Sequence, residues 1–195
     1  MKSMHALLVL GLLASPGVSQ TSKRDSPAVD RLLKDTETIA SSQHKNILLI
    51  FNASWCGPCH RLESFLADPA MRPIFDRHFV KLVVDYGERS DDTRHQDTPG
   101  ADQLIDSLHD TDTGLPLIVM LSSSGKPIVD SVRPVYGRRN NHANIGYPYS
   151  PTGIDWFLEM LRRAAPSLTS NESETIQNWL LQHSEYGRIE PTSNR

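Results

Sequence analysis

The chain has 195 residues but only two cysteines, Cys56 and Cys59. So few cysteines exclude a disulfide-rich scaffold, and a bridge across so short a loop would restrict the unfolded chain too little to be a useful staple. No apolar run is long enough to span a bilayer comfortably. The net charge of −3 gives no support for nucleic acid as a partner. A hydrophobic content of 38% is ordinary for a globular protein with one core.

The two cysteines lie where a strand is expected to give way to a helix. Residues 47–51 read Ile-Leu-Leu-Ile-Phe, which predicts a buried strand, and apolar residues at helical spacing follow the cysteines. Unpaired N–H groups and the dipole at a helix start favour an anion. Because a thiolate is the nucleophile in disulfide exchange, we expect Cys56 to attack and Cys59, one turn inside the helix, to resolve the mixed disulfide.

The residues around the cysteines fit that chemistry. Trp55 is expected to form an apolar wall beside the sulfur, and Gly57 to allow another backbone to approach closely. Pro58 suits the first helical turn, where its missing N–H costs little.

A second hypothesis comes from the same residues. Cys-Gly-Pro-Cys-His also matches the attachment motif of c-type haem, with His60 as one iron ligand and Met71, Met120 or a distant histidine as the other. The strand before the motif argues against it.

Trp-Cys-Gly-Pro-Cys after an apolar strand resembles the active site of the thioredoxin family. The resemblance covers residues 27–165. It implies an α/β thioredoxin fold, with a central mixed sheet flanked by helices, and thiol–disulfide oxidoreductase activity, with Cys56 as nucleophile and Cys59 as resolving thiol. It implies no cofactor other than this redox-active disulfide. The Gly-Pro pair resembles the reducing members more than the strongly oxidising ones.

The periodicity predicts helices over 27–42, 68–78, 101–109 and 151–165, and strands over 47–52, 79–86, 117–121 and 126–132. Ser26 and Ser150 are expected caps. A further helix over 171–183, with Asn171 and Glu174 at capping-box spacing, belongs to a C-terminal appendage over 166–183 that thioredoxin lacks. A flexible tail is expected over 184–195.

The resemblance also implies a substrate groove. Leu115-Pro116 opens a strand, as does the cis-proline of the family, and Leu115 would pair with a bound substrate strand. With Trp55, Gly57 and Pro58, these residues would form the groove. The alternative is an ordinary trans proline.

The chain departs from the family pattern below the cysteines. Ile50 stands where thioredoxin carries a buried aspartate that is thought to serve the resolving cysteine. Glu63, one helical turn beyond Cys59, can reach it or remain a surface charge. Lys81 matches the lysine that accompanies that aspartate, or simply extends to solvent. His60 is either a tuner of thiol pKa or a solvated helix residue.

Residues 1–19 are predicted to be a secretory signal peptide cleaved near Ser19, and residues 20–26 a flexible N-terminus. Export to the periplasm or the exterior would place the dithiol in an oxidising compartment. A reductase there acts on protein disulfides and must itself be reduced again. We therefore expect a second partner, an electron-donor thiol protein in the membrane. We expect a monomer.

Two loops complete the prediction. Residues 87–100 are interpreted as a surface loop, since the aspartate spacing matches no calcium site and no metal is expected. Residues 133–150 are either a plain insertion or a partner-contacting loop through Tyr147 and Tyr149. The functional alternatives are a dithiol oxidase of the same fold and a redox-inactive binding module that uses the groove beside Pro116.

Overall fold

The structure is a computed structural model that describes residues 28–108, 113–134 and 142–184. The predicted signal peptide over 1–19, the segment 20–26 with the expected cap Ser26, and the tail from 185 onward lie outside the described residues. Within the described residues, no helix is both long and apolar enough to cross a membrane.

A four-stranded mixed sheet forms the centre of the protein, in the order β2-β1-β3-β4. The strands are β1 (Asn46–Asn52), β2 (Phe79–Asp85), β3 (Leu117–Leu121) and β4 (Pro127–Asp130). A helical crossover joins β1 to β2, which are parallel, whereas β3 is antiparallel to both β1 and β4. The mixed sheet predicted from the sequence is confirmed.

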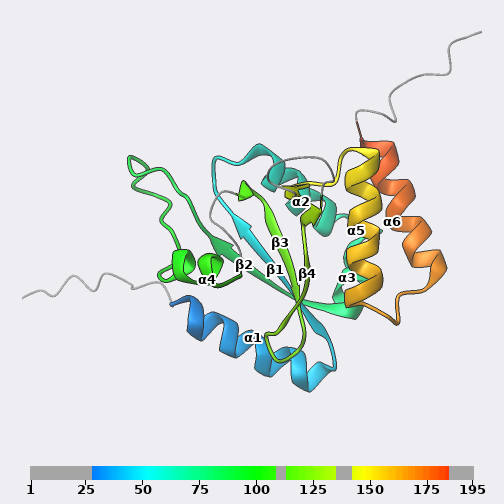
Figure 1. Cartoon of the computed structure of the whole chain (residues 1–195), viewed down its shortest axis with the longest axis horizontal. Helices are drawn as coiled ribbons and strands as arrows, with labels where there is room; N and C mark the ends of the chain where they lie inside the picture. Colours follow the sequence, from blue (N-terminus) through cyan, green and yellow to red (C-terminus); the bar gives the residue numbers. More distant parts are fainter. Residues whose placement is uncertain (1–27, 109–112, 135–141, 185–195) are drawn as a thin grey trace, which may run out of the picture.

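Helices cover both faces of this sheet (Figure 1). On one face α1 (Val29–Gln43) and α4 (Ala101–Leu108) pack against alternate residues of β1, such as Leu49 and Phe51. On the other face lie α2 (Gly57–Ala67), α3 (Arg72–His78), α5 (Pro151–Ala164) and α6 (Ser170–His183), packed against Leu48 and Ile50. The unbroken apolar run of β1 follows from burial on both faces.

The helix ends agree only partly with the sequence predictions. The Ser150 side chain caps α5 as expected, accepting from the Gly153 amide at 3.1 Å. The box predicted for Asn171 and Glu174 is wrong: α6 begins one residue earlier, and Thr169 and Glu172 form its capping box. Both pairs have the required spacing, so the sequence pattern alone did not decide between them.

The described residues at the two ends of the segment 133–150 include strands. A small two-stranded sheet pairs β5 (Val132–Pro134) with β6 (His142–Asn144), which corrects the prediction of a long loop. These strands are three residues long, too short to leave an alternating apolar pattern that sequence reading can detect.

Helix α6 contributes to the main core on its face of the sheet. Ile176 and Leu180 are fully buried, in one apolar cluster with residues of α2, α3 and α5. The Trp179 ring lies with its centroid 4.9 Å from that of Phe65, which belongs to α2. The helix predicted as an appendage is therefore packed directly against the helix that follows the cysteines.

A buried carboxylate fixes the start of α6 to α3. Glu172 accepts hydrogen bonds from the Thr169 amide and hydroxyl, both at 2.9 Å, and also pairs with Arg77. The oxygen that accepts from Thr169 also lies 3.5 Å from Nε2 of the buried His78, whereas the other oxygen pairs with Arg77. The hydrogen bond from the Thr169 amide is the largest cause that lowers the pKa of Glu172, partly opposed by desolvation.

Replacing this carboxylate should weaken the fold in a pH-dependent way. Because the folded-state pKa of Glu172 is lowered, its stabilising contribution is present above its unfolded-state pKa and is lost as the pH falls through the folded value. We expect Glu172→Gln to reduce the free energy of unfolding by about 1–2 kcal/mol at neutral pH, and the deficit to shrink in acid. Urea unfolding at both pH values measures it. Glu174→Gln, an exposed change in the same helix, serves as control; a deficit independent of pH would contradict the assignment.

Candidate active site

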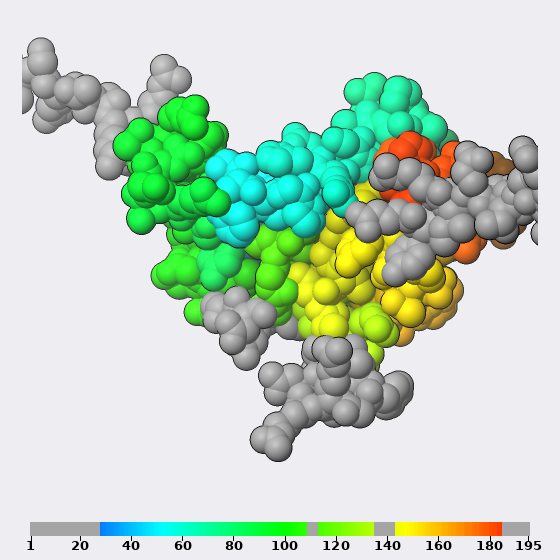
Figure 2. Space-filling model, turned by 90° about the horizontal axis from the view of Figure 1, so that it is seen from above, coloured from blue at the N-terminus to red at the C-terminus, as the bar shows by residue number. Residues whose placement is uncertain are grey.

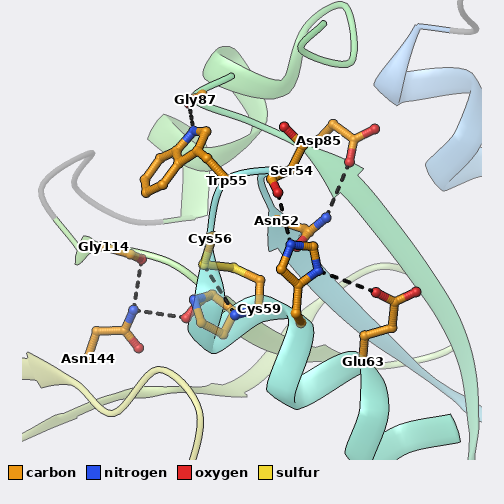
Figure 3. The surroundings of a disulfide bond; sticks show 12 residues. Asn52, Ser54, Trp55, Cys56, Cys59, Glu63, Asp85, Gly87, Gly114 and Asn144 are labelled. Atoms are coloured by element: carbon orange, nitrogen blue, oxygen red, sulfur yellow. Dashed lines mark hydrogen bonds and ion pairs between the residues drawn. A yellow bond between two sulfur atoms is a disulfide. The ribbon is translucent and has the colours of Figure 1, made fainter. Parts of the chain in front are cut away.

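The two cysteines form a disulfide between the end of β1 and the start of α2 (Figure 3). Cys56 is the N-cap of α2, and its Sγ accepts a hydrogen bond from the Cys59 amide at 3.2 Å. The Cys59 and His60 amides also donate to the Cys56 carbonyl, at 3.1 and 3.2 Å. The first turn of the helix is thus arranged around Cys56, whose thiolate would receive an amide hydrogen bond and the positive end of the helix dipole.

Both cysteine residues are buried, each only 2% exposed, in a small apolar cluster with Ala53 and Leu115. Exposure therefore does not distinguish the expected attacking cysteine from the expected resolving cysteine. The difference between them lies in their helix positions, since Cys56 is the cap and Cys59 lies inside the first turns.

The residues next to the cysteines form the exposed rim of the site. Trp55 is 48% exposed, and its indole N–H donates to the Gly87 carbonyl at 2.8 Å. Gly57 and Pro58 are exposed as well. A Cβ at Gly57 would meet nothing within 4 Å, so the space that a substrate backbone would need is open there.

The Leu115–Pro116 bond is cis, as the family resemblance implied. Leu115 packs on the two cysteines. Asn144 lies beside this bond (Figure 3), and its side-chain amide donates to the carbonyls of Gly114 and Pro116, at 2.9 and 3.1 Å. Sequence reasoning missed Asn144, because an isolated asparagine in a segment of irregular pattern gives no signal of its partners.

A second missed residue, Glu88, holds the segment just before Cys56. Its carboxylate accepts from the Ser54 amide and hydroxyl, both at 2.6 Å, and its own amide donates to Asp97 at 2.7 Å. Because β1 and β2 are parallel, the residues that follow them meet at the same edge of the sheet. That rule could have indicated Glu88, which follows β2 by three positions.

The segment 87–100 is thus a surface loop that also supports the active site. Part of it is internally paired: a hydrogen bond from His95 is the main cause that lowers the pKa of Asp92 to about 2. Among the described residues, no group of three or more histidine, cysteine or acidic side chains is arranged to hold a metal ion.

His60 and Glu63 are close together on the exposed side of α2. Nε2 of His60 lies 2.9 Å from the Ser54 carbonyl, which can only accept, so this nitrogen carries the proton. Nδ1 lies 3.9 Å from the Glu63 carboxylate, whose side chain is 75% exposed. The imidazole therefore connects the segment before Cys56 to the first turns of α2.

A small cavity of about 80 Å³ lies beneath Cys59. Ile50 and Leu62 form apolar walls, while Glu63 and Lys81 supply the charged groups at its lining. The structure thus brings Glu63 and Lys81 to the cavity that Cys59 borders, although both residues are exposed. Ile50, where the resemblance would lead one to expect an aspartate, is only 5% exposed.

Comparison with known proteins agrees with this architecture. Residues 35–123 match the family described as thioredoxin-like, a stretch that includes both cysteines and Pro116. The fold is the thioredoxin fold. Its sheet, its flanking helices and the strand-to-helix position of the cysteines confirm the fold predicted from the sequence.

The solved structures to which this chain is similar are distant from it in sequence. A disulphide isomerase from Xylella fastidiosa Temecula1 is 17% identical with a TM-score of 0.45, and the alignment covers 89% of this chain and 98% of that one. A thioredoxin-fold protein from Helicobacter pylori is 14% identical with a TM-score of 0.38, covering 72% and 86%. The oxidised C-terminal domain of DsbD from Neisseria meningitidis is 22% identical with a TM-score of 0.35, covering 52% and 84%. A comparison with curated proteins found no match.

We expect Glu88 to be a positioning residue with a measurable effect on the disulfide. Its negative charge, held against Ser54, disfavours a second negative charge on nearby Cys56. Glu88→Gln should therefore stabilise the thiolate and make the reduction potential less negative, by about 10–30 mV. Equilibration with glutathione buffers measures the shift. Asp91→Asn, an equal change of charge in the same loop, should leave the potential unchanged; an equal shift in both variants would refute a specific role for Glu88.

Proposed function

We propose that the protein is a thiol–disulfide oxidoreductase that reduces or isomerises protein disulfides. The observation that carries this proposal is the Cys56–Cys59 disulfide at the start of α2, with the Cys59 amide directed at Cys56 Sγ. Such an amide stabilises a thiolate on Cys56 in the reduced protein. A disulfide that closes so short a loop is a poor structural staple, and its place on a thioredoxin-like sheet favours redox chemistry.

In the reducing direction the reaction takes two exchanges. The Cys56 thiolate attacks one sulfur of a substrate disulfide, and the other substrate sulfur leaves as a thiolate with the electron pair of the broken bond. Cys59, after losing its proton, then attacks Cys56 Sγ. The second substrate sulfur leaves as a thiolate, so the substrate has gained two electrons and the Cys56–Cys59 disulfide has formed again.

The backbone beside Pro116 offers a place for the substrate chain. The Asn144 side chain donates hydrogen bonds to the carbonyls of Gly114 and Pro116, the residues on either side of Leu115. Among the hydrogen bonds of the described residues, none involves the Leu115 backbone. An extended substrate segment that passes Cys56 can pair with these free groups, as in other cases of strand addition.

The compartment and the partners follow from the predicted signal peptide. Export would place the protein in an oxidising environment, in the periplasm or outside the cell. A reductase there becomes oxidised with each substrate, so it requires an electron-donor thiol protein. The same site working in the opposite direction would make the protein a dithiol oxidase, which remains the nearest alternative.

The residues do not fit the haem alternative well. Met71 and Met120 are both 0% exposed inside the main core, away from solvent. Nε2 of His60 is engaged with the Ser54 carbonyl. The cysteine variants described next distinguish the enzyme from the alternative of a redox-inactive binding module.

The cysteine variants test the order of the two exchanges. Cys56→Ser should not accelerate the reduction of insulin by dithiothreitol beyond the uncatalysed rate, because no nucleophile remains at the helix cap. Cys59→Ser should instead accumulate a mixed disulfide between Cys56 and the substrate, visible by mass spectrometry under non-reducing conditions. Full function in Cys56→Ser would favour the binding module, and trapping through Cys59 instead of Cys56 would reverse the assigned roles.

The reduction potential tests the direction. We expect the Cys56–Cys59 couple of the protein lacking residues 1–19 to lie near that of thioredoxin, about −270 mV. Equilibration in glutathione redox buffers, followed by thiol alkylation, gives the value. A potential near about −120 mV would instead make the protein an oxidant.

A further inference from the structure

An open hollow with a volume of about 360 Å³ lies next to the active site, between α2 and α6. His60 and Arg61 come from α2, Tyr147 and Tyr149 from the segment after β6, and Trp179 and His183 from α6. We call this hollow the α2–α6 groove. One wall of the groove is formed by α6, the helix that the sequence predicts to be an appendage.

The groove is continuous with the proposed substrate site. His60 directly follows Cys59 and lines the groove. At the other end of the site, a Cβ at Gly146 would lie 3.7 Å from the Pro116 ring, so the chain passes from the cis-proline directly into Tyr147. Figure 2 shows the cyan segment around the cysteines next to the yellow residues near 150, with the red end of α6 beyond them. A substrate bound at Cys56 therefore has residues of its own within reach of the groove.

The basic side chains of the groove differ in what they face. Nδ1 of His60 lies 3.9 Å from the Glu63 carboxylate, and the ring of His183 stacks on that of Trp179. Arg61 forms no ion pair with any residue in the described ranges. It is exposed, and within the described parts of the chain no carboxylate pairs with its guanidinium.

Aromatic rings form the rest of the lining. The Trp179 ring stacks on that of His183 at a centroid distance of 3.8 Å, which fixes both side chains. Tyr147 is 5% exposed, while Tyr149 is 45% exposed. Burial raises the pKa of Tyr147, and the positive charge of Arg61, which lines the same groove, partly opposes that effect. The hollow thus combines one available positive charge with flat apolar surface.

We propose that the α2–α6 groove binds an acidic side chain of the protein substrate, which pairs with Arg61 while neighbouring substrate residues pack on Tyr149 and Trp179. This proposal rests on the function proposed above and states a sequence preference for the same site. It assigns to α6 a role in choosing substrates, because without α6 the groove would lose one wall.

Because the protein is negatively charged overall, a preference for acidic peptides would test the local contacts in the groove. The chain carries a net charge of −3, which disfavours the approach of an acidic peptide at long range. Faster reaction with an acidic peptide must therefore come from local contacts. It should weaken as salt is added, since an exposed pair is screened.

The experiment uses blocked peptides whose single cysteine is linked to 2-thiopyridine, with one Glu or one Gln placed at successive positions on either side of the cysteine. When the Cys56 thiolate attacks the peptide sulfur, thiopyridone leaves and its absorbance gives the rate constant. The full chain without residues 1–19 is reduced and freed of reductant first. Measurements at about pH 8 keep ordinary histidines neutral, since their pKa is about 6.5.

We expect at least one Glu peptide to react about threefold faster than its Gln counterpart at low salt, a typical size for an exposed ion pair. Arg61→Gln should remove the preference, so that this variant reacts with the Glu and Gln peptides at equal rates. Arg31→Gln removes the same charge from exposed α1, on the other face of the sheet, and should preserve the preference.

The outcomes distinguish a failure of the groove assignment from a failure of the proposed oxidoreductase function. Equal rates for all Glu and Gln pairs in the unmodified protein, or a preference that survives in Arg61→Gln, would overturn the groove assignment while leaving the oxidoreductase in place. No reaction with any peptide would instead overturn the proposed function itself.

Discussion

The cap of α2 is the constraint on which the site depends. Because Cys56 is the N-cap of α2, the Cys59 amide is directed at Cys56 Sγ. The two cysteines then lie close enough to form the disulfide. That geometry requires the end of β1 to be fixed relative to the helix. Burial of β1 on both faces supplies one part of this rigidity. The bonds from Ser54 to Glu88 and from Trp55 to Gly87 supply the other.

The second half of the site depends on Asn144. One side-chain amide spans the carbonyls before and after Leu115, so a short strand inserted before α5 holds the backbone that faces the disulfide. The redox pair and the proposed substrate-binding backbone are thus positioned by different parts of the chain. They meet because β1 and β3 are neighbours in the sheet.

The strands of the main sheet, the helices and the position of the cysteines could be predicted from the sequence, because each rests on a local pattern. An apolar run followed by helical spacing is visible without any tertiary contact. The partnership of Ser54 with Glu88 spans 34 positions, and that of Asn144 with Gly114 spans 30, so neither leaves a local signal. The capping box of α6 failed for a different reason, since two pairs with the same spacing compete there. The segment 133–150 was read as a loop because its strands are too short for a pattern.

The packing of α6 on α2 has a practical consequence for the choice of fragments. The stretch that matches the thioredoxin-like family ends at residue 123, before α5 and α6 begin. A fragment cut there would keep β1, β2, β3 and both cysteines, but it would lose β4 and would leave Phe65 of α2 without the rings of Phe157 and Trp179. The shortest piece that retains a closed core around the cysteines must therefore extend to the end of α6. Recognisable family sequence and folding unit do not coincide in this protein.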